Sequence, residues 1–336
     1  MSILKENDYY TILNLEAPLK GSKSVNKRYV LHNSNRLIEI LKSLNVVAVN
    51  ISNNHVMDWK EEGFHSLINE LTTNNIMYFG AGMVYDKAVK LKYIKIKEKK
   101  IALLGFGWDE EMCVYASEKK PGVAPLSKKL IIQKIIDSKK IADYTIVSLH
   151  WGYEYEVYPL PIHREFAREF IDNGADIIIG HHSHVIQAYE IYKDKYIFYG
   201  LGNFYFGSRR VNFANLNNNI YGDLSKFGLG VIVDFNTFNV KTLGFKYENS
   251  ITRFFNNSFN CPDISEIEMS DYNKYFKNNR TSNLKPSLYI GAFNFFFNWL
   301  KLIVFSLKCL LTRKAINLLK KTNLYEPLKK IKFRVR

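Results

Sequence analysis

The first half of the chain alternates between short apolar runs and longer amphipathic stretches, a pattern typical of a layered α/β fold. Residues 33–44 have helical spacing in Leu37, Leu41 and Leu44, while residues 46–51 form an apolar run typical of a buried strand. We expect further strands at 9–15, 76–79, 93–96, 101–106, 144–149 and 177–179, and further helices at 61–71, 128–141 and 164–173. Helices that alternate with buried strands pack outside a central sheet.

The pattern changes after residue 180 to pairs of strands joined by short turns. Residues 189–192 and 196–201 predict one hairpin, and residues 230–235 and 240–247 predict a second. Antiparallel strands added to the earlier alternation indicate a sandwich of two sheets flanked by helices. By contrast, Gly80 and Gly82 are expected in a simple turn, since no Walker lysine follows them.

The composition divides the 336 residues into three parts. Residues 1–248 carry the strand and helix pattern and are expected to form one domain. Residues 249–286 are rich in Asn, Asp and Ser and are expected to be a polar linker or an irregular excursion. Residues 287–336 are expected to form an apolar and basic helical tail.

Positive charge is concentrated in that tail. The formal net charge of the chain is +15, and residues 299–336 hold eleven Lys or Arg against one Glu, which gives +10. Such a tail fits an anionic partner, either a phospholipid surface or a nucleic acid. The apolar run 287–311 is long enough to span a membrane, but Lys301 and Lys308 would each cost about 3 kcal/mol at the midplane. The preferred interpretation of residues 287–336 is therefore attachment to an anionic membrane surface. Helical packing or an oligomer contact ranks second, and a membrane-spanning helix ranks last.

Localisation is expected to be cytoplasmic, with peripheral attachment at the inner membrane surface. The three cysteines lie far apart, so neither a disulfide framework nor a zinc knuckle is indicated. The N-terminal residues show no basic region followed by a long apolar run, so no signal peptide is predicted.

Histidines carry the most informative chemistry because neutral imidazole binds transition metals and exchanges protons near neutral pH. Five of the eight follow predicted strands directly: His55, His150, His181, His182 and His184. Ligand sites of open α/β sheets lie at the carboxyl ends of the strands. These side chains are therefore expected to meet in one site.

Each of these elements also has a purely structural interpretation. Asn53, Asn54 and His55 alone fit a turn with a cap, and His150 alone is as well explained as a core residue. The run 180–184 is harder to explain by packing, because three imidazoles in four residues repel one another when protonated, whereas a His-x-His pair can face one metal centre.

Five motifs occur in the order found in capsule-synthesis proteins of the CapA type, and the chain resembles that family over residues 8–247. The motifs are NLEAPL at 14–19, NNHVMD at 53–58, HWGYEY at 150–155, GHHSHV at 180–185 and GLGNF at 200–204. The family is associated with poly-γ-glutamate and related envelope polymers. It resembles calcineurin-like metallophosphoesterases, which implies a four-layer α/β/β/α sandwich with metals held between its loops.

The resemblance also implies roles for residues of this chain. Glu16 would be a bridging carboxylate, Asn54, His150 and His182 would ligate one metal, and His184 would ligate another. His55 would be the general acid that protonates the leaving oxygen. Asp58 and Glu154 would orient imidazoles. The implied cofactor is one or two divalent transition metal ions, Mn, Fe or Zn.

One feature of the family pattern is missing. Family members begin with a strand that ends in Gly-Asp, whose carboxylate helps to hold the first metal, and no Gly-Asp precedes Glu16 here. The fold is therefore expected to lack its first strand and to expose a sheet edge. The remaining ligands would hold at most one metal, or none.

Three functions follow from this sequence. The leading hypothesis is a capsule or exopolymer biosynthesis protein with a metal-dependent hydrolase-like site, whose partner is an envelope polymer or its phosphorylated precursor. The alternative is a non-catalytic scaffold that holds other capsule-synthesis proteins at the membrane. A nucleic-acid phosphodiesterase ranks last, because residues 1–298 lack a basic and aromatic stripe that would track a backbone.

Overall fold

A computed structural model describes residues 9–27, 29–205, 224–248, 251–255 and 261–281. These residues all belong to one compact unit, Met1–Asn283. The predicted tail, 287–336, lies outside the described residues. Within the described part of the chain, no helix combines the length and the apolar character needed to cross a membrane.

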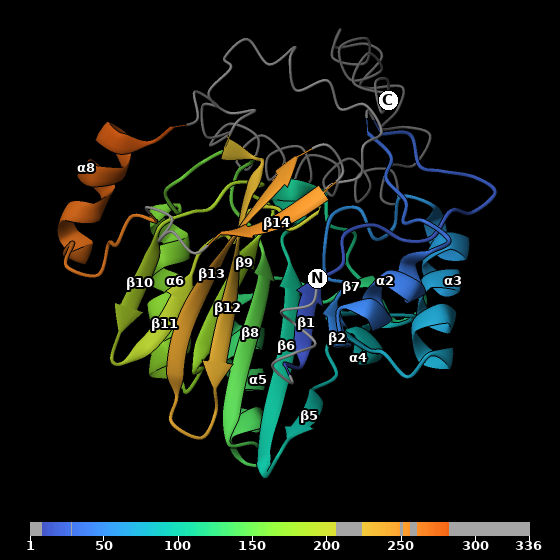
Figure 1. Cartoon of the computed structure of the whole chain (residues 1–336), viewed down its shortest axis with the longest axis horizontal. Coiled ribbons are helices and arrows are strands. Elements are labelled where there is room, and N and C mark those ends of the chain that lie inside the picture. Colours follow the sequence, from blue (N-terminus) through green and yellow to red (C-terminus); the bar gives the residue numbers. More distant parts are fainter. Residues whose placement is uncertain (1–8, 28, 206–223, 249–250, 256–260, 282–336) are drawn as a thin grey trace, which may run out of the picture. The chain divides into compact units, whose positions relative to one another are not determined.

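The first sheet contains three parallel strands in the order β1 (Thr11–Asn14), β2 (Val46–Asn50) and β3 (Met77–Phe79). Helices α2 (Leu37–Ser43) and α3 (Lys60–Thr73) cover one face of it (Figure 1). Leu41 and Leu67, from these helices, pack in one cluster with Val49 of β2. The short strand β4 (Ala81–Gly82), where a turn was expected, pairs with β7 (Gly122–Val123), and helix α4 (Tyr85–Ala88) follows it.

The second sheet has six strands. Its order is β10 (Tyr189–Tyr192), β11 (Lys195–Phe198), β9 (Ile177–His181), β8 (Tyr144–His150), β6 (Lys99–Gly107) and β5 (Lys92–Ile96). The four central strands are parallel and the two outer strands are antiparallel to their neighbours. Helices α5 (Lys128–Lys139) and α6 (Pro161–Asp172) pack on one face of this sheet.

Alternate residues along the strands of the second sheet point to opposite faces and pack in two different hydrophobic cores, because side chains of a strand alternate with a period of two residues. In β8, Val147 and Leu149 pack toward α5 and α6, while Ile146 packs with Ala48 and Phe79 of the first sheet. The layers are therefore helices, first sheet, second sheet and helices. The predicted α/β/β/α sandwich is confirmed.

A third, antiparallel sheet contains β12 (Phe227–Asp234), β13 (Asn239–Glu248) and β14 (Ile251–Phe255). Leu229 of β12 packs with Ile179 of β9 and Phe198 of β11, so this sheet lies on the same face of the six-stranded sheet as β1–β3. The stretch predicted as a polar linker or irregular excursion contains β14 and helix α8 (Met269–Asn279). Tyr272 and Phe276 of α8 are buried in the α5–α6 core, and these two side chains explain why a polar segment forms an ordered helix there.

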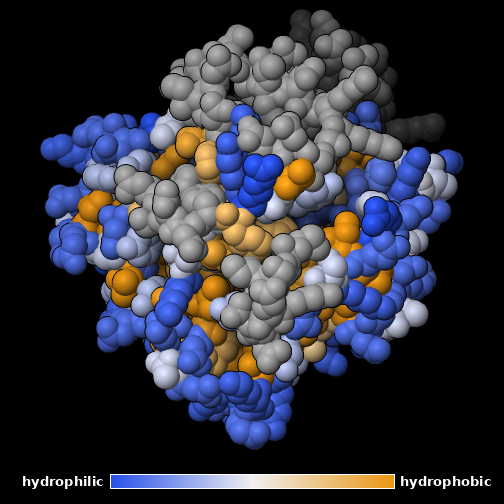
Figure 2. All heavy atoms as spheres, viewed as in Figure 1, coloured by the Kyte–Doolittle hydropathy of each residue, from blue (hydrophilic) through white to orange (hydrophobic). Residues whose placement is uncertain are grey.

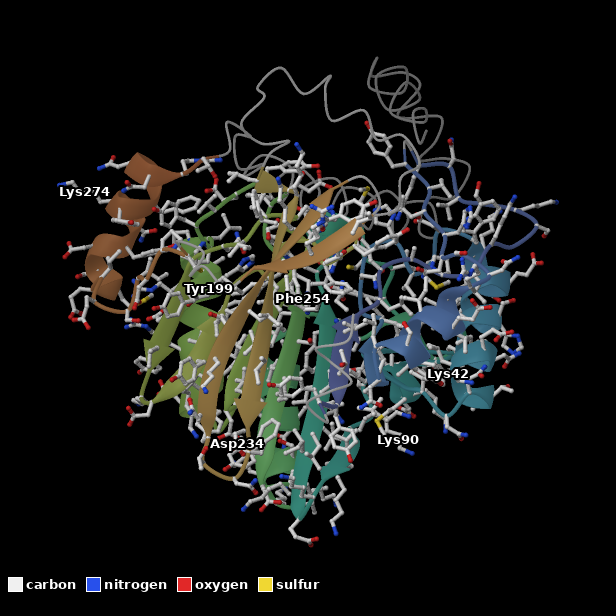
Figure 3. All side chains as sticks on the ribbon, in the orientation of Figure 1. Lys42, Lys90, Tyr199, Asp234, Phe254 and Lys274 are labelled. Atoms are coloured by element: carbon white, nitrogen blue, oxygen red, sulfur yellow. The ribbon has the colours of Figure 1, made fainter. Side chains whose placement is uncertain are left out.

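Among the described residues, β1 pairs with β2 on one side and with no strand on the other. In the described part of the chain, β1 is therefore an edge strand of this sheet. A cavity of 2310 Å³ is lined by β1 and β12, with Ile146 of β8 and Ile179 of β9 also in its wall. Asp234 and Phe254, labelled in Figure 3, both line it. On the face drawn in Figure 2, hydrophobic residues gather toward the middle and hydrophilic residues cover the lower rim.

Candidate metal centre

The loops after β1 and β2 are tied together by one side chain. Asn53 accepts hydrogen bonds from the backbone N–H of His55 and Ala17, at 3.2 and 3.4 Å, and donates to the backbone oxygen of Leu15 at 2.9 Å. Glu16 therefore lies in a loop held against the Asn54–His55 turn. The polar run after strand 46–51 is thus more than a turn, because its side chains join two strands.

Three buried groups meet at the carboxyl ends of β2, β8 and β9. His150 Nε2 lies 3.0 Å from Asn54 Oδ1 and 3.1 Å from His182 Nδ1. All three residues are less than 5% exposed. Residues separated by up to 128 positions therefore form one cluster, as the strand-end rule predicts.

Each of the three atoms has a hydrogen-bond partner within the cluster, and the imidazole tautomers decide which atom donates. Ligands on one ion with bonds of about 2.0 to 2.1 Å lie about 3 Å apart, which is the spacing of these atoms. The donor set therefore fits a divalent transition metal.

Two further polar atoms, Glu16 Oε1 and His150 Nδ1, are buried and have no hydrogen-bond partner within the described residues. The negative charge of Glu16 acts on both His181 and His182. A buried carboxylate oxygen without a hydrogen-bond partner is the kind of group that a bound cation satisfies. No group of three His, Cys, Asp or Glu side chains suited to a metal occurs in the described part of the chain, so the amide of Asn54 is essential to this ligand set.

His184 is held by Asn203 on the far side of His182. Its Nδ1 lies 3.0 Å from Asn203 Oδ1, and Asn203 Nδ2 donates to the backbone oxygens of His184 and Ser225. Donation by Nδ1 leaves the ring's lone pair on Nε2. The rings of His182 and His184 are 6.1 Å apart, and both residues have positive φ, at 94° and 55°.

His55 is positioned by a buried carboxylate. Its Nδ1 lies 2.6 Å from Asp58 Oδ2, which also accepts from the backbone N–H of Leu31. Lys27 Nζ donates to Asp58 Oδ1 at 2.9 Å and to the backbone oxygen of Asn54 at 2.6 Å. Burial opposes ionisation of Asp58, but the hydrogen bond and charge of His55 prevail and lower the pKa of the carboxyl group. Lys27 was not predicted from the sequence.

Glu111 is the second residue that the sequence did not predict. It ends the short helix η1 (Asp109–Glu111), and its Oε2 lies 3.0 Å from His182 Nε2. Burial works against protonation of His182, but Glu111 outweighs it and raises the pKa of this imidazole. Glu154, predicted to orient an imidazole, acts on His182 through its charge. A sequence signal for Glu111 existed, since an acidic run follows strand 101–106 at the same sheet edge.

Burial favours the neutral imidazole at His150 and at His181. Burial, reinforced by His182, lowers the pKa of His150 well below its usual value. Burial also lowers the pKa of His181 to about 4, and its Nε2 lies 3.5 Å from Ser148 Oγ. Neutral imidazoles can offer a lone pair to a metal.

Comparison with known proteins places these motifs in a family. The family model described as "Bacterial capsule synthesis protein PGA_cap" matches residues 1–208. The PGA biosynthesis protein CapA of Bacillus subtilis is 36% identical over 208 residues, which cover 61% of this chain and 54% of that protein. The capsule biosynthesis protein CapA of Bacillus anthracis is 31% identical over 212 residues, which cover 60% and 51%. The chain spans about half the length of these curated relatives.

Solved structures match less closely. A hypothetical protein from Thermus thermophilus has a TM-score of 0.42 and 13% identity, over 76% of this chain and 89% of that one. A 5'-nucleotidase precursor from the same organism has a TM-score of 0.41 and 13% identity, over 63% and 41%.

Proposed function

The chain belongs to the bacterial capsule synthesis protein family PGA_cap, and from this premise we propose that it acts in the biosynthesis of a capsule or exopolymer of the poly-γ-glutamate kind. Its site would be a metal-dependent hydrolase centre of the phosphoesterase type. The substrate class we propose is an envelope polymer or its phosphorylated precursor.

The observation that carries the proposal is the contact of three ligand atoms. Asn54 Oδ1, His150 Nε2 and His182 Nδ1 lie 3.0 to 3.1 Å apart in sequence of contact, which is also the spacing of ligands that share one ion. Glu16, whose Oε1 has no hydrogen-bond partner among the described residues, supplies a negative charge that acts on His182. A set of one amide, two imidazoles and a nearby carboxylate fits Mn, Fe or Zn.

The roles of the protein side chains follow from their contacts. A divalent ion bound at the cluster would polarise a phosphoryl or acyl oxygen of the substrate. His55 would hold the proton for the leaving oxygen: Asp58 fixes its Nδ1–H, so Nε2 is the atom left to exchange a proton. His184, held by Asn203, would be a ligand of a second ion.

The test combines metal analysis with a generic phosphodiester assay. We expect the purified protein to bind a transition metal, and the His182→Ala variant to lose it. His65→Ala is the matched control, because His65 is an exposed histidine of α3 and belongs to none of the five motifs. Turnover that depends on His182 but not on His65 would support a hydrolase. Metal binding without turnover would favour the scaffold alternative, and equal metal content in all three proteins would refute the proposed centre.

A further inference from the structure

The ring of His182 is engaged at both nitrogens. Nδ1 faces His150 Nε2 at 3.1 Å, and Nε2 faces Glu111 Oε2 at 3.0 Å. The His182 side chain is 1% exposed and that of Glu111 is 19% exposed, so water competes weakly for this contact. A carboxylate only accepts, and therefore the contact requires the proton of the imidazole to be on Nε2.

A proton on Nε2 decides which atom of His182 can bind a metal. A neutral imidazole carries one N–H, so its lone pair is then on Nδ1. Nδ1 is the atom that faces His150 Nε2, which in turn contacts Asn54 Oδ1. Glu111 thus favours the tautomer whose lone pair points into the ligand cluster, in the manner of carboxylate–histidine–metal triads.

The backbone holds Glu111 in register with the cluster. Trp108, just before η1, donates its N–H to the backbone oxygen of His150 at 3.1 Å. Its own backbone oxygen accepts from the N–H groups of Glu111 and Cys113, each at 3.3 Å. Tyr115 closes the turn by donating its hydroxyl to Asp109 at 2.9 Å. The η1 turn is therefore anchored to the strand end that carries His150.

We propose that Glu111 is a positioning residue that sets the tautomer of His182, so that Nδ1 becomes the metal-binding atom. This inference rests on the proposed metal centre and deepens it. Glu111 would act through His182 and not as a ligand itself, because the imidazole nitrogen nearest to its carboxylate is the one turned away from His150 and Asn54.

The first experiment needs no metal. Nitrogen-15 shifts of the His182 ring, measured in metal-free protein at alkaline pH, report which nitrogen carries the proton. We expect the Nε2–H tautomer in the unmodified protein and in the Glu110→Gln control, which removes one negative charge from the same turn at an exposed side chain. Glu111→Ala should shift the ring toward a mixture of tautomers. An Nδ1–H tautomer in the unmodified protein would overturn the proposal.

The second experiment measures zinc affinity by competition with a chelator. Loss of a carboxylate that orients a metal-binding histidine typically weakens binding about 10- to 100-fold, so we expect that loss in Glu111→Ala and little change in Glu110→Gln. Glu111→Leu, whose side chain has no hydrogen-bond acceptor, provides a second variant if the alanine protein is unfolded. Equal zinc affinity in the Glu111 and Glu110 variants would contradict the proposal.

The two experiments fail in different ways. If the unmodified protein binds no zinc, the proposed metal centre is wrong, while the ring shifts still test whether Glu111 sets the tautomer. If zinc binds but the tautomer is the same with and without Glu111, the centre stands and the role of Glu111 is wrong.

Discussion

Replacing Asp58 with asparagine tests whether the buried carboxylate holds the His55 loop in place. The side chain of Asp58 is fully buried and contacts the His55 ring, the Lys27 ammonium and the backbone N–H of Leu31. Asparagine has nearly the same shape but no charge, so the variant leaves the Lys27 ammonium, which is 17% exposed, without its counter-ion.

The expected loss in the free energy of unfolding depends on how far water reaches the Lys27 side chain. Removing one partner of a buried ion pair costs about 3 to 5 kcal/mol, and partial access of water to Lys27 places Asp58→Asn near the lower value, about 3 kcal/mol. The assay is denaturant unfolding at neutral pH. Asp137→Asn is the control, since Asp137 forms an ion pair with Lys140 on the surface of α5, and a much smaller change is expected there.

The pH dependence gives a second check on the same residue. Because the folded pKa of Asp58 is below its ordinary value of 3.8, the carboxylate stabilises the fold above that pH. The contribution is lost as pH falls from 3.8 through the folded pKa, so the stability gap between the protein and its Asp58→Asn variant should narrow in that range. A gap below about 0.5 kcal/mol at neutral pH, the size of an ordinary surface substitution, would refute the reasoning.

Three other predictions concern the core, the tail and catalysis. Glu190→Gln should lower the free energy of unfolding by about 3 to 5 kcal/mol, because it leaves the buried Arg164 guanidinium without its counter-ion. Denaturant titration measures this free energy, and a loss no larger than that in the exposed Glu165→Gln variant would contradict the prediction. Removal of residues 287–336 should release the protein from anionic vesicles in a sedimentation assay without lowering its melting temperature, and unchanged pelleting at the same salt concentration would show the anchoring idea to be wrong. Phosphodiesterase turnover by the chain should be lost in His182→Ala, because His182 Nδ1 belongs to the proposed ligand cluster; turnover that persists in this variant would show that the cluster does not supply the chemistry.

The sequence predicted the meeting of Asn54, His150 and His182 because each follows a buried strand, and the carboxyl ends of parallel strands gather at one edge of the fold. It did not predict Lys27 or Glu111. A lysine in a loop is usually solvated, and the η1 turn is too short to leave a periodic signal. Helix α8 was missed for a similar reason, since Tyr272 and Phe276 supply almost all of its burial and the other residues around them are polar.

The left-handed backbone at His182 and His184 affects which substitutions this motif tolerates during evolution. A side chain in that conformation costs about 1 to 2 kcal/mol per residue relative to glycine, so the motif maintains its imidazoles at the expense of stability. A library selected only for thermal resistance should enrich glycine or asparagine at position 182, while one selected for metal retention should conserve histidine. A difference between the two libraries in the residues recovered at position 182 would show that histidine is kept there for metal binding and not for folding.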